Sequence, residues 1–146
     1  MIRANNANEV TPMSSIQSDE ALYGLLARAG ARRQLDAGTV VFEKGSRGDA
    51  MYIVSSGAVE LSDGDRVLDT VSAPGLLGEL ALIESTPRAL AATVRAGAEL
   101  VEILARTFWV LVNETPYFAQ LVMRVMADRL RRASGRQADA SVPAAG

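Results

Sequence analysis

Four short runs of β-forming residues alternate with glycine-containing turns between residues 39 and 71 of this 146-residue chain. The runs are 39–42, 51–54, 58–62 and 66–71, and the segments between them are 45–49, 55–57 and 63–64. Asp63-Gly64 predicts a two-residue hairpin, because both central positions of such a turn need a positive φ. Regularly spaced short strands with turns of this kind predict a sandwich or a jelly-roll barrel.

Helical patterns flank this β-rich part. Ser18 fits an N-cap ahead of the acidic pair 19–20, the apolar residues of 22–29 share one face, and Gly30 is a possible stop. Two more strands are expected at 90–95 and 99–104, then a short helix at 107–113 and a longer one at 117–132 that starts at Pro116. The predicted fold class is mainly β with flanking helices: a jelly-roll β-barrel with an N-terminal helix and two C-terminal helices.

One domain with two tails is the expected organisation. Residues 1–17 are polar and lack periodicity, which predicts a flexible N-terminal tail, and residues 135–146 predict a disordered C-terminal tail. The domain between them spans 18–134. The N-terminus lacks the apolar core of a signal peptide, and no apolar run approaches the ~18 residues that span a bilayer, so we expect a cytoplasmic protein without membrane contact.

The chain contains neither Cys nor His. These two absences exclude disulfides, thiol nucleophiles, Ser-His-Asp catalysis and zinc sites built from Cys or His. The net charge of −2 provides no overall basic field for nucleic acid. We therefore expect no enzyme activity, no metal or cofactor, and no direct binding of nucleic acid.

The most informative segment is 75–89, with the sequence GLLGELALIESTPRA. Gly78 allows the backbone to approach a ligand closely, and 79–83 fits a single helical turn whose N-terminus attracts anions. Arg88 follows where the chain re-enters the barrel. An Arg beside backbone donors forms a cradle for phosphate, and Glu79 adds an acceptor for a hydroxyl. One phosphate, one hydroxyl and an apolar barrel wall describe a nucleotide monophosphate.

This segment resembles the phosphate-binding cassette of cyclic nucleotide-binding domains, which occur in the catabolite activator protein, in regulatory subunits of protein kinase A and in cyclic-nucleotide-gated channels. The resemblance rests on Gly78-Glu-Leu-Ala-Leu-Ile83 followed by Pro87-Arg88-Ala89. Upstream segments at 38–42, 45–49, 51–54 and 57–59 match in order and spacing. It covers roughly residues 18–133.

The resemblance implies a role for each cassette residue. Glu79 is expected to accept a hydrogen bond from the ribose 2′-OH and Arg88 to pair with the cyclic phosphate, beside Gly78 and the amides of Leu80, Ala81 and Ala89. Members selective for cGMP often have Thr where this chain has Ala89, which favours cAMP as the ligand, with cGMP possible. The next residue is usually small, so Leu90 is a departure and is expected to fill the barrel beneath the ligand.

The last helix corresponds to the lid of the family. Its apolar face is wider than one barrel contact requires, so it has surplus area to cover the base or to contact a partner, including a second copy of the chain. Arg129, Leu130 and Arg132 lie near the end where such lids reach the base, and which side chain caps it stays open. An exposed helix end is the alternative reading of the arginines. Phe108-Trp109 is expected to pack the preceding helix onto the barrel.

The hypothesis from the sequence is a cAMP-binding sensor whose C-terminal helix moves on binding and is read by an unknown effector protein. One alternative is a degenerate fold without ligand that serves as a protein–protein interaction module, with Glu79 and Arg88 as a buried ion pair. Another is a regulator truncated before its output domain. No winged helix-turn-helix, channel segment or kinase domain is recognisable in these residues.

Overall fold

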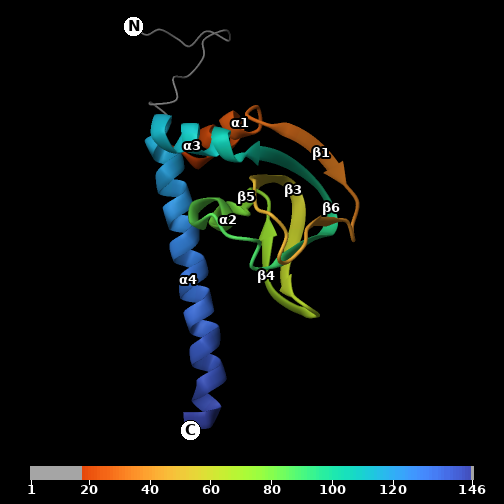
Figure 1. Ribbon diagram of the computed structural model, residues 1–146, viewed down its shortest axis with the longest axis vertical. Coiled ribbons are helices and arrows are strands. Elements are labelled where there is room, and N and C mark those ends of the chain that lie inside the picture. Colours follow the sequence, from red (N-terminus) through yellow and green to blue (C-terminus); the bar gives the residue numbers. More distant parts are fainter. Residues whose placement is uncertain (1–17, 146) are drawn as a thin grey trace, which may run out of the picture.

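The computed structural model describes residues 18–145, with side chains through residue 135. Figure 1 shows a strongly curled sheet beside one long helix, with two shorter helices across the upper end of the sheet. The elements in chain order are α1 (Asp19–Leu26), β1 (Ala31–Leu35), β2 (Val40–Phe42), β3 (Ala50–Asp63), β4 (Arg66–Ser72), β5 (Gly75–Leu77), α2 (Glu79–Glu84), β6 (Ala91–Leu104), α3 (Ala105–Glu114) and α4 (Pro116–Ala145). The predicted fold class, a mainly β jelly roll with one helix before it and two after it, is confirmed, and among the described strands the roll is open rather than a closed barrel. The tail predicted at 1–17 lies outside the described residues.

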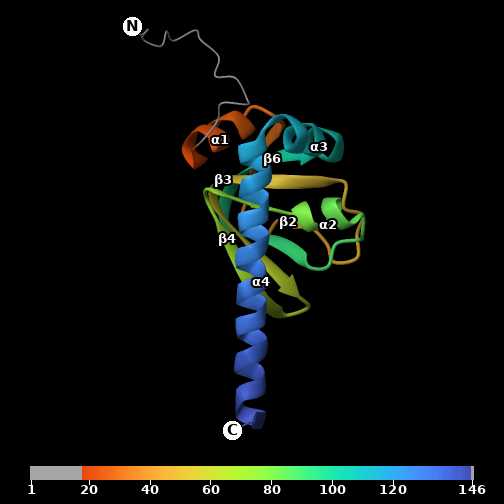
Figure 2. The ribbon, with the colours of Figure 1, turned by 90° about the vertical axis from the view of Figure 1, so that its left-hand side faces the viewer.

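Two long antiparallel strands, β3 and β6, form the centre of the six-stranded sheet. β1 and β2 pair with β6, while β4 and β5 pair with β3, all antiparallel. The main path runs β1-β6-β3-β4, so within the described strands hydrogen bonds leave the roll open and do not close it into a barrel. α4 runs along one side of the curled sheet, as the turned view in Figure 2 shows.

The long central strands correct two boundaries expected from the sequence. β3 runs straight through 55–57, which was predicted to be a turn, and β6 joins the two runs that were predicted to be separate. The glycine signal marks a bulged region, since the β3–β6 register shifts between Val54 and Val59 and Gly57 has a φ of 81°. A Cβ on Gly57 would lie 2.2 Å from the carbonyl oxygen of Gly97, so the two strands approach each other through glycine.

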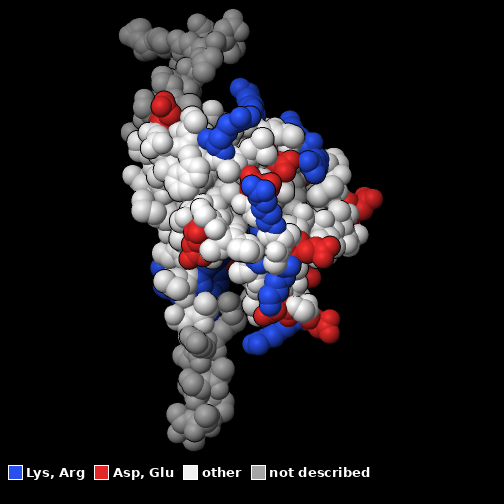
Figure 3. Space-filling view, viewed as in Figure 1, with Lys and Arg blue, Asp and Glu red and all other residues white. Residues whose placement is uncertain are grey.

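Sequence patterns missed β1 and β5. β1 reads Ala-Arg-Arg-Gln-Leu, and four of its five residues are exposed, so it has no apolar alternation. Ion pairs across the strands join it to β6: Arg32 to Glu99 at 3.3 Å and Arg33 to Glu102 at 2.7 Å. Figure 3 shows basic and acidic side chains interspersed on this side of the molecule, without a continuous basic surface.

The hairpin predicted at Asp63-Gly64 is present, but its turn lies one residue later. Asp63 ends β3 and pairs with Arg66, so the turn residues are Gly64 and Asp65, and of these only Gly64 has a positive φ, 63°. The predicted cap of the first helix is confirmed. The Ser18 side chain accepts a hydrogen bond from the amide of Ala21 and caps α1. α1 ends at Leu26, before the possible stop at Gly30.

Two apolar clusters hold the fold together. One lies beneath the helices, where the ring centroids of Phe108 and Phe118 are 5.7 Å apart and contact is edge-on. The other lines the interior of the roll, around Val59, Leu77 and Leu100. Phe108 packs α3 as expected, whereas Trp109 remains 43% exposed.

α4 begins at Pro116, as predicted from the sequence. Its backbone continues to Ala145 and so runs through the segment 135–146 where a disordered tail was predicted. Because the side chains beyond residue 135 lie outside the described part, the domain boundary at 134 stays a prediction. None of the helices described has the length and apolar character needed to cross a bilayer.

Candidate functional site

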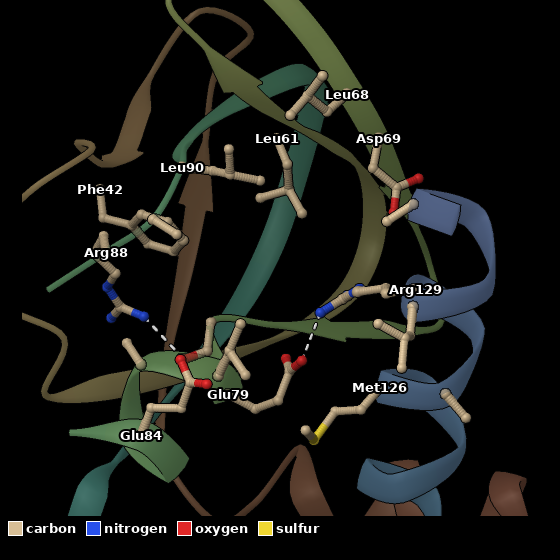
Figure 4. Close-up of a pocket in the computed structure, with 17 residues that line it drawn as sticks. Phe42, Leu61, Leu68, Asp69, Glu79, Glu84, Arg88, Leu90, Met126 and Arg129 are labelled. Carbon is tan, nitrogen blue, oxygen red and sulfur yellow. Dashed lines mark hydrogen bonds and ion pairs between the residues drawn. The ribbon is translucent and has the colours of Figure 1, made fainter. Parts of the chain in front are cut away.

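A cavity of about 560 Å³ lies between the inner face of the roll, α2 and α4. Nine of the ten residues singled out from the sequence line it: Gly78, Glu79, Leu80, Ala81, Arg88, Ala89, Leu90, Arg129 and Leu130. The tenth, Arg132, lies beside it. The other lining residues are Phe42, Leu61, Leu68, Asp69, Glu84, Met126, Ala127 and Ala133. The cassette and the last helix therefore meet around one space, as Figure 4 shows.

Arg88 lies at one side of the cavity, is only 4% exposed, and is held by several contacts. Its Nη1 donates to the carbonyl of Gly78 at 2.9 Å and its Nη2 to the carbonyl of Ala50 at 2.5 Å. The guanidinium carbon lies 4.1 Å from the ring centroid of Phe42. Burial lowers the pKa of Arg88 from its ordinary value, because the lost hydration outweighs the opposing effect of Tyr52, Asp49 and Glu79. The Nε atom is buried without a hydrogen-bond partner.

The glycine-rich loop before β3 braces the backbone of this arginine. Gly45 donates to the carbonyl of Arg88, and the amide of Arg88 donates to the carbonyl of Ser46, both at 2.8 Å. Gly45 has a φ of 83°, which explains the glycine there. The turn at 45–49 has the structural role that its composition suggests.

Gly78 places the start of α2 against Arg88. It is the N-cap of α2 with a φ of 85°, and a Cβ there would lie 2.9 Å from Nη1 of Arg88. Both the backbone angle and the close approach therefore require glycine. The single helical turn predicted after Gly78 is confirmed as α2.

Glu79, the first residue of α2, is buried with 1% exposure and bonds to the last helix. Its Oε2 accepts from Nη1 of Arg129 at 2.6 Å, and Arg129 also donates to the carbonyl of Leu76. The pairing of Glu79 with Arg88, considered as an alternative from the sequence, is wrong. The other carboxylate oxygen of Glu79, Oε1, is buried without a partner.

The part of α4 beyond Arg129 closes the remaining side of the cavity with small and apolar side chains. Leu130 lines the cavity but is 69% exposed, so it lies at the rim. Arg132 points to neighbouring carboxylates: its Nη1 is 2.7 Å from Asp69 and its Nη2 is 2.5 Å from Asp128. Arg132 thus joins α4 to β4 rather than lining the cavity.

The sequence did not identify Phe42 and Asp69 as residues that line the cavity. Phe42 contacts Arg88 through its ring, and Asp69 accepts a hydrogen bond from Arg132. Phe42 was placed in a strand, and its contact with Arg88 depends on how β2 pairs with β6 in space. Asp69 is one polar residue within a predicted strand, and no motif marks it. The signal for Phe42 was its position in the matched upstream segment, but that position says nothing about which way the ring faces.

The cavity presents complementary chemistry for a small anion that carries a hydroxyl. A buried guanidinium attracts negative charge, and its Nε lacks an acceptor. The buried Oε1 of Glu79 lacks a donor. Buried polar atoms nearly always have partners, so these two atoms point to a ligand that supplies one acceptor and one donor.

A curled antiparallel sheet that holds a buried arginine against a glycine-capped helical turn defines a β-roll domain with a cavity on its inner face. The chain belongs to the cyclic nucleotide-binding domain family, whose model matches residues 32–115, more than half of the chain. This confirms the family that the cassette residues indicate.

Three known proteins place this membership in context. The chain is 32% identical over 107 residues to a CRP-like cAMP-activated global transcriptional regulator of Mycobacterium tuberculosis, covering 70% of this chain and 48% of that protein. It is 33% identical over 115 residues to lysophospholipase NTE1 of Cryptococcus neoformans, covering 76% of this chain and 7% of that protein. The crystal structure of the Thermus thermophilus catabolite activator protein superimposes with a TM-score of 0.72 at 26% identity, covering 90% of this chain and 63% of that one. The chain thus spans less than half the length of these two curated relatives.

Proposed function

We propose that this domain is a non-catalytic cytoplasmic sensor that binds cAMP in preference to cGMP and transmits binding through α4 to an effector protein. The observation that carries the proposal is that two residues lining one cavity, Arg88 and Glu79, each keep a buried polar atom without a partner, Nε and Oε1. A cyclic nucleotide has a phosphate and a 2′-hydroxyl that satisfy both.

The cyclic phosphate binds at Arg88. Phe42 and the two backbone carbonyls hold the guanidinium in place before a ligand arrives, so little side-chain entropy is lost on binding. The N-terminus of α2 adds backbone N–H groups beside it, with Ala89 at the cavity wall. A charge-assisted contact of this kind contributes about 1.5–3 kcal/mol.

The ribose binds at Glu79. The 2′-hydroxyl donates to Oε1, while Oε2 keeps its bond to Arg129 of α4. Glu79 of α2 would then accept one hydrogen bond from the ligand and one from Arg129 of α4. The ligand would therefore contribute to the contact between α2 and α4. The ligand thereby shifts the population of α4 positions, and the exposed Met123 and Leu130 offer an effector or a second copy an apolar surface.

The preference for cAMP is supported by Ala89, which has no hydroxyl for the guanine amino group. The cAMP-activated regulator of Mycobacterium tuberculosis among the relatives agrees with it. The base lies against Leu61, Leu68 and Leu90 of the roll. The sequence contains no His and no Cys, so it has neither a Ser-His nor a Cys-His catalytic pair. We propose that the domain carries no catalysis.

Isothermal titration with cAMP and cGMP tests the proposal on wild type, Arg88→Gln and Arg95→Gln. Arg95 is the matched control, because its side chain is 61% exposed and its contact with Glu60 is long, with 3.6 Å between Nε and Oε2. We expect cAMP binding that weakens about ten- to hundredfold in Arg88→Gln and stays within about twofold in Arg95→Gln. Folded wild-type protein, shown to be free of co-purified nucleotide, that gives no heat with either ligand would overturn the sensor and favour the interaction module.

A further inference from the structure

Asp69 of β4 is a carboxylate in the apolar part of the cavity, and neither the cassette nor the lid accounts for it. Figure 4 shows it beside α4, close to Leu61 and Leu68 and on the side of the cavity away from Arg88. Its side chain is 14% exposed and lines the cavity. A carboxylate among leucines has to be held there by specific hydrogen bonds.

Those hydrogen bonds fix the orientation of the carboxylate. Oδ1 accepts from the amide of Thr70 at 2.9 Å and from Nη1 of Arg132 at 2.7 Å. Arg132 is itself braced by Asp128, whose Oδ2 accepts from Nη2. Both bonds to Asp69 use Oδ1, so Oδ2 is the oxygen that can accept a hydrogen bond from a molecule in the cavity.

We propose that Asp69 determines specificity for the base by accepting a hydrogen bond from the amino group at position 6 of adenine. This inference rests on the proposed function. With the phosphate at Arg88 and the ribose at Glu79, the base extends toward the end of the cavity where Asp69 lies. Adenine has a donor at position 6, whereas guanine has a carbonyl oxygen, which an ionised carboxylate repels.

Arg132 positions Asp69 and does not touch the base. Its bond to Oδ1 explains how the carboxylate is oriented beside Leu61 and Leu68. It also ties the base-binding end of the cavity to α4, since Arg132 belongs to that helix. Contact at the base and contact at the ribose therefore reach α4 through two separate arginines.

The test compares Asp69→Asn with the matched control Asp128→Asn. Asp128 also bonds Arg132 but does not line the cavity. Three ligands are titrated by calorimetry: cAMP, cGMP and the analogue of cAMP with hydrogen in place of the 6-amino group. In wild type we expect the analogue to bind about tenfold or more weakly than cAMP, the cost of a lost hydrogen bond to a charged group.

In Asp69→Asn we expect that difference to become smaller than in wild type, because a neutral amide oxygen accepts a weaker hydrogen bond than a carboxylate does. We expect the ratio of cAMP to cGMP affinity to fall about tenfold, because the amide nitrogen can donate to the guanine oxygen. Asp128→Asn is expected to keep both ratios. If Asp69→Asn weakens all three ligands equally, or if cGMP binding is lost more than cAMP binding, the inference is wrong while the sensor stands. If wild type binds none of the three, the proposed function fails and the inference fails with it.

Discussion

Three charged side chains, Glu79, Arg88 and Arg129, surround one cavity with exposures of 1%, 4% and, for the Arg129 side chain, 22%. Ions at such depth are tolerated only when specific groups replace water around them. Backbone carbonyls and the Phe42 ring do this for Arg88, and Arg129 does it for Glu79. Arg88 Nε and Glu79 Oε1 have no hydrogen-bond partner in the protein, and the proposed ligand would supply one to each.

Replacing Glu79 by Gln tests the ribose contact. The amide keeps the size of the side chain but weakens its hydrogen bond to the 2′-hydroxyl, so we expect cAMP affinity to fall about tenfold. Wild type is expected to bind cAMP more tightly than 2′-deoxy-cAMP, and calorimetry on the variant is expected to show a smaller difference between the two ligands. A variant that distinguishes the two ligands as strongly as wild type does would place the ribose elsewhere.

Replacing Gly78 by Ala tests whether the glycine serves the backbone or the site. Gly78 and Gly38 have φ values of 85° and 90°, so Ala at either position is strained and costs about 1–2 kcal/mol of unfolding free energy in urea titrations. A Cβ on Gly38 meets nothing within 4 Å, whereas one on Gly78 crowds Arg88. We expect only Gly78→Ala to weaken cAMP binding as well, and equal binding by both variants would refute a role of Gly78 in placing Arg88.

Single residues were predictable from the sequence where a local pattern carried them. Gly78, Glu79 and Arg88 lie within one short segment, so spacing alone brought them together. Arg129 was named as a residue near the lid, but its bond to Glu79 spans 50 positions and depends on how α4 crosses the roll. Asp69 and Phe42 could not be found in this way, because their side-chain directions follow from strand pairing.

At the scale of elements, α4 contributes five residues to the cavity lining and bonds to α2 through Arg129 and to β4 through Arg132. Its first turns bond α1 through Tyr117 and Arg124, which both donate to Oδ1 of Asp19, at 2.6 and 3.2 Å. Its periodicity and the proline at its start made it predictable. β1 was not, since ion pairs and backbone pairing rather than buried side chains define it.

The α1–α4 contact is expected to depend on pH. The hydrogen bonds from Tyr117 and Arg124 lower the pKa of Asp19 below its ordinary value of 3.8. A lowered carboxylate pKa stabilises the fold above 3.8, and this stability is lost as the pH falls through the value in the folded state. Thermal unfolding followed by circular dichroism is expected to show wild type more stable than Asp19→Asn at pH 6, with the two melting temperatures converging at lower pH. A gap that stays constant across this range would contradict the assignment.

At the scale of the whole molecule, ligand binding and folding stability are linked. A ligand that binds only the folded domain at about 100 times its Kd stabilises it by about 2.7 kcal/mol. For wild type with cAMP we expect the melting temperature to rise by several degrees, and Arg88→Gln to show little shift at the same concentration. A shift of equal size in both would mean that cAMP binds outside the cavity.

The whole fold was predicted more completely than its strand boundaries. The order of helix, β-roll and two helices follows from periodicity and turn residues. A turn was predicted at 55–57 and a break between the strands 90–95 and 99–104, because glycine occurs in both turns and bulges. Only the pairing of β3 with β6 shows that Gly57 and Gly97 lie in a bulge and not in a turn.

The length of the last helix would enlarge the effect of any change of its tilt at the cavity. Arg129 is fixed to Glu79 near the cavity, and the roughly 16 residues from there to Ala145 extend about 24 Å at the rise of an α-helix. A tilt of about 5° about that point would displace the end of the helix by about 2 Å, from the same helical rise. In the proposed sensor, a small rearrangement around the ribose would therefore become a displacement of about 2 Å at the end of α4, where an effector protein would detect it.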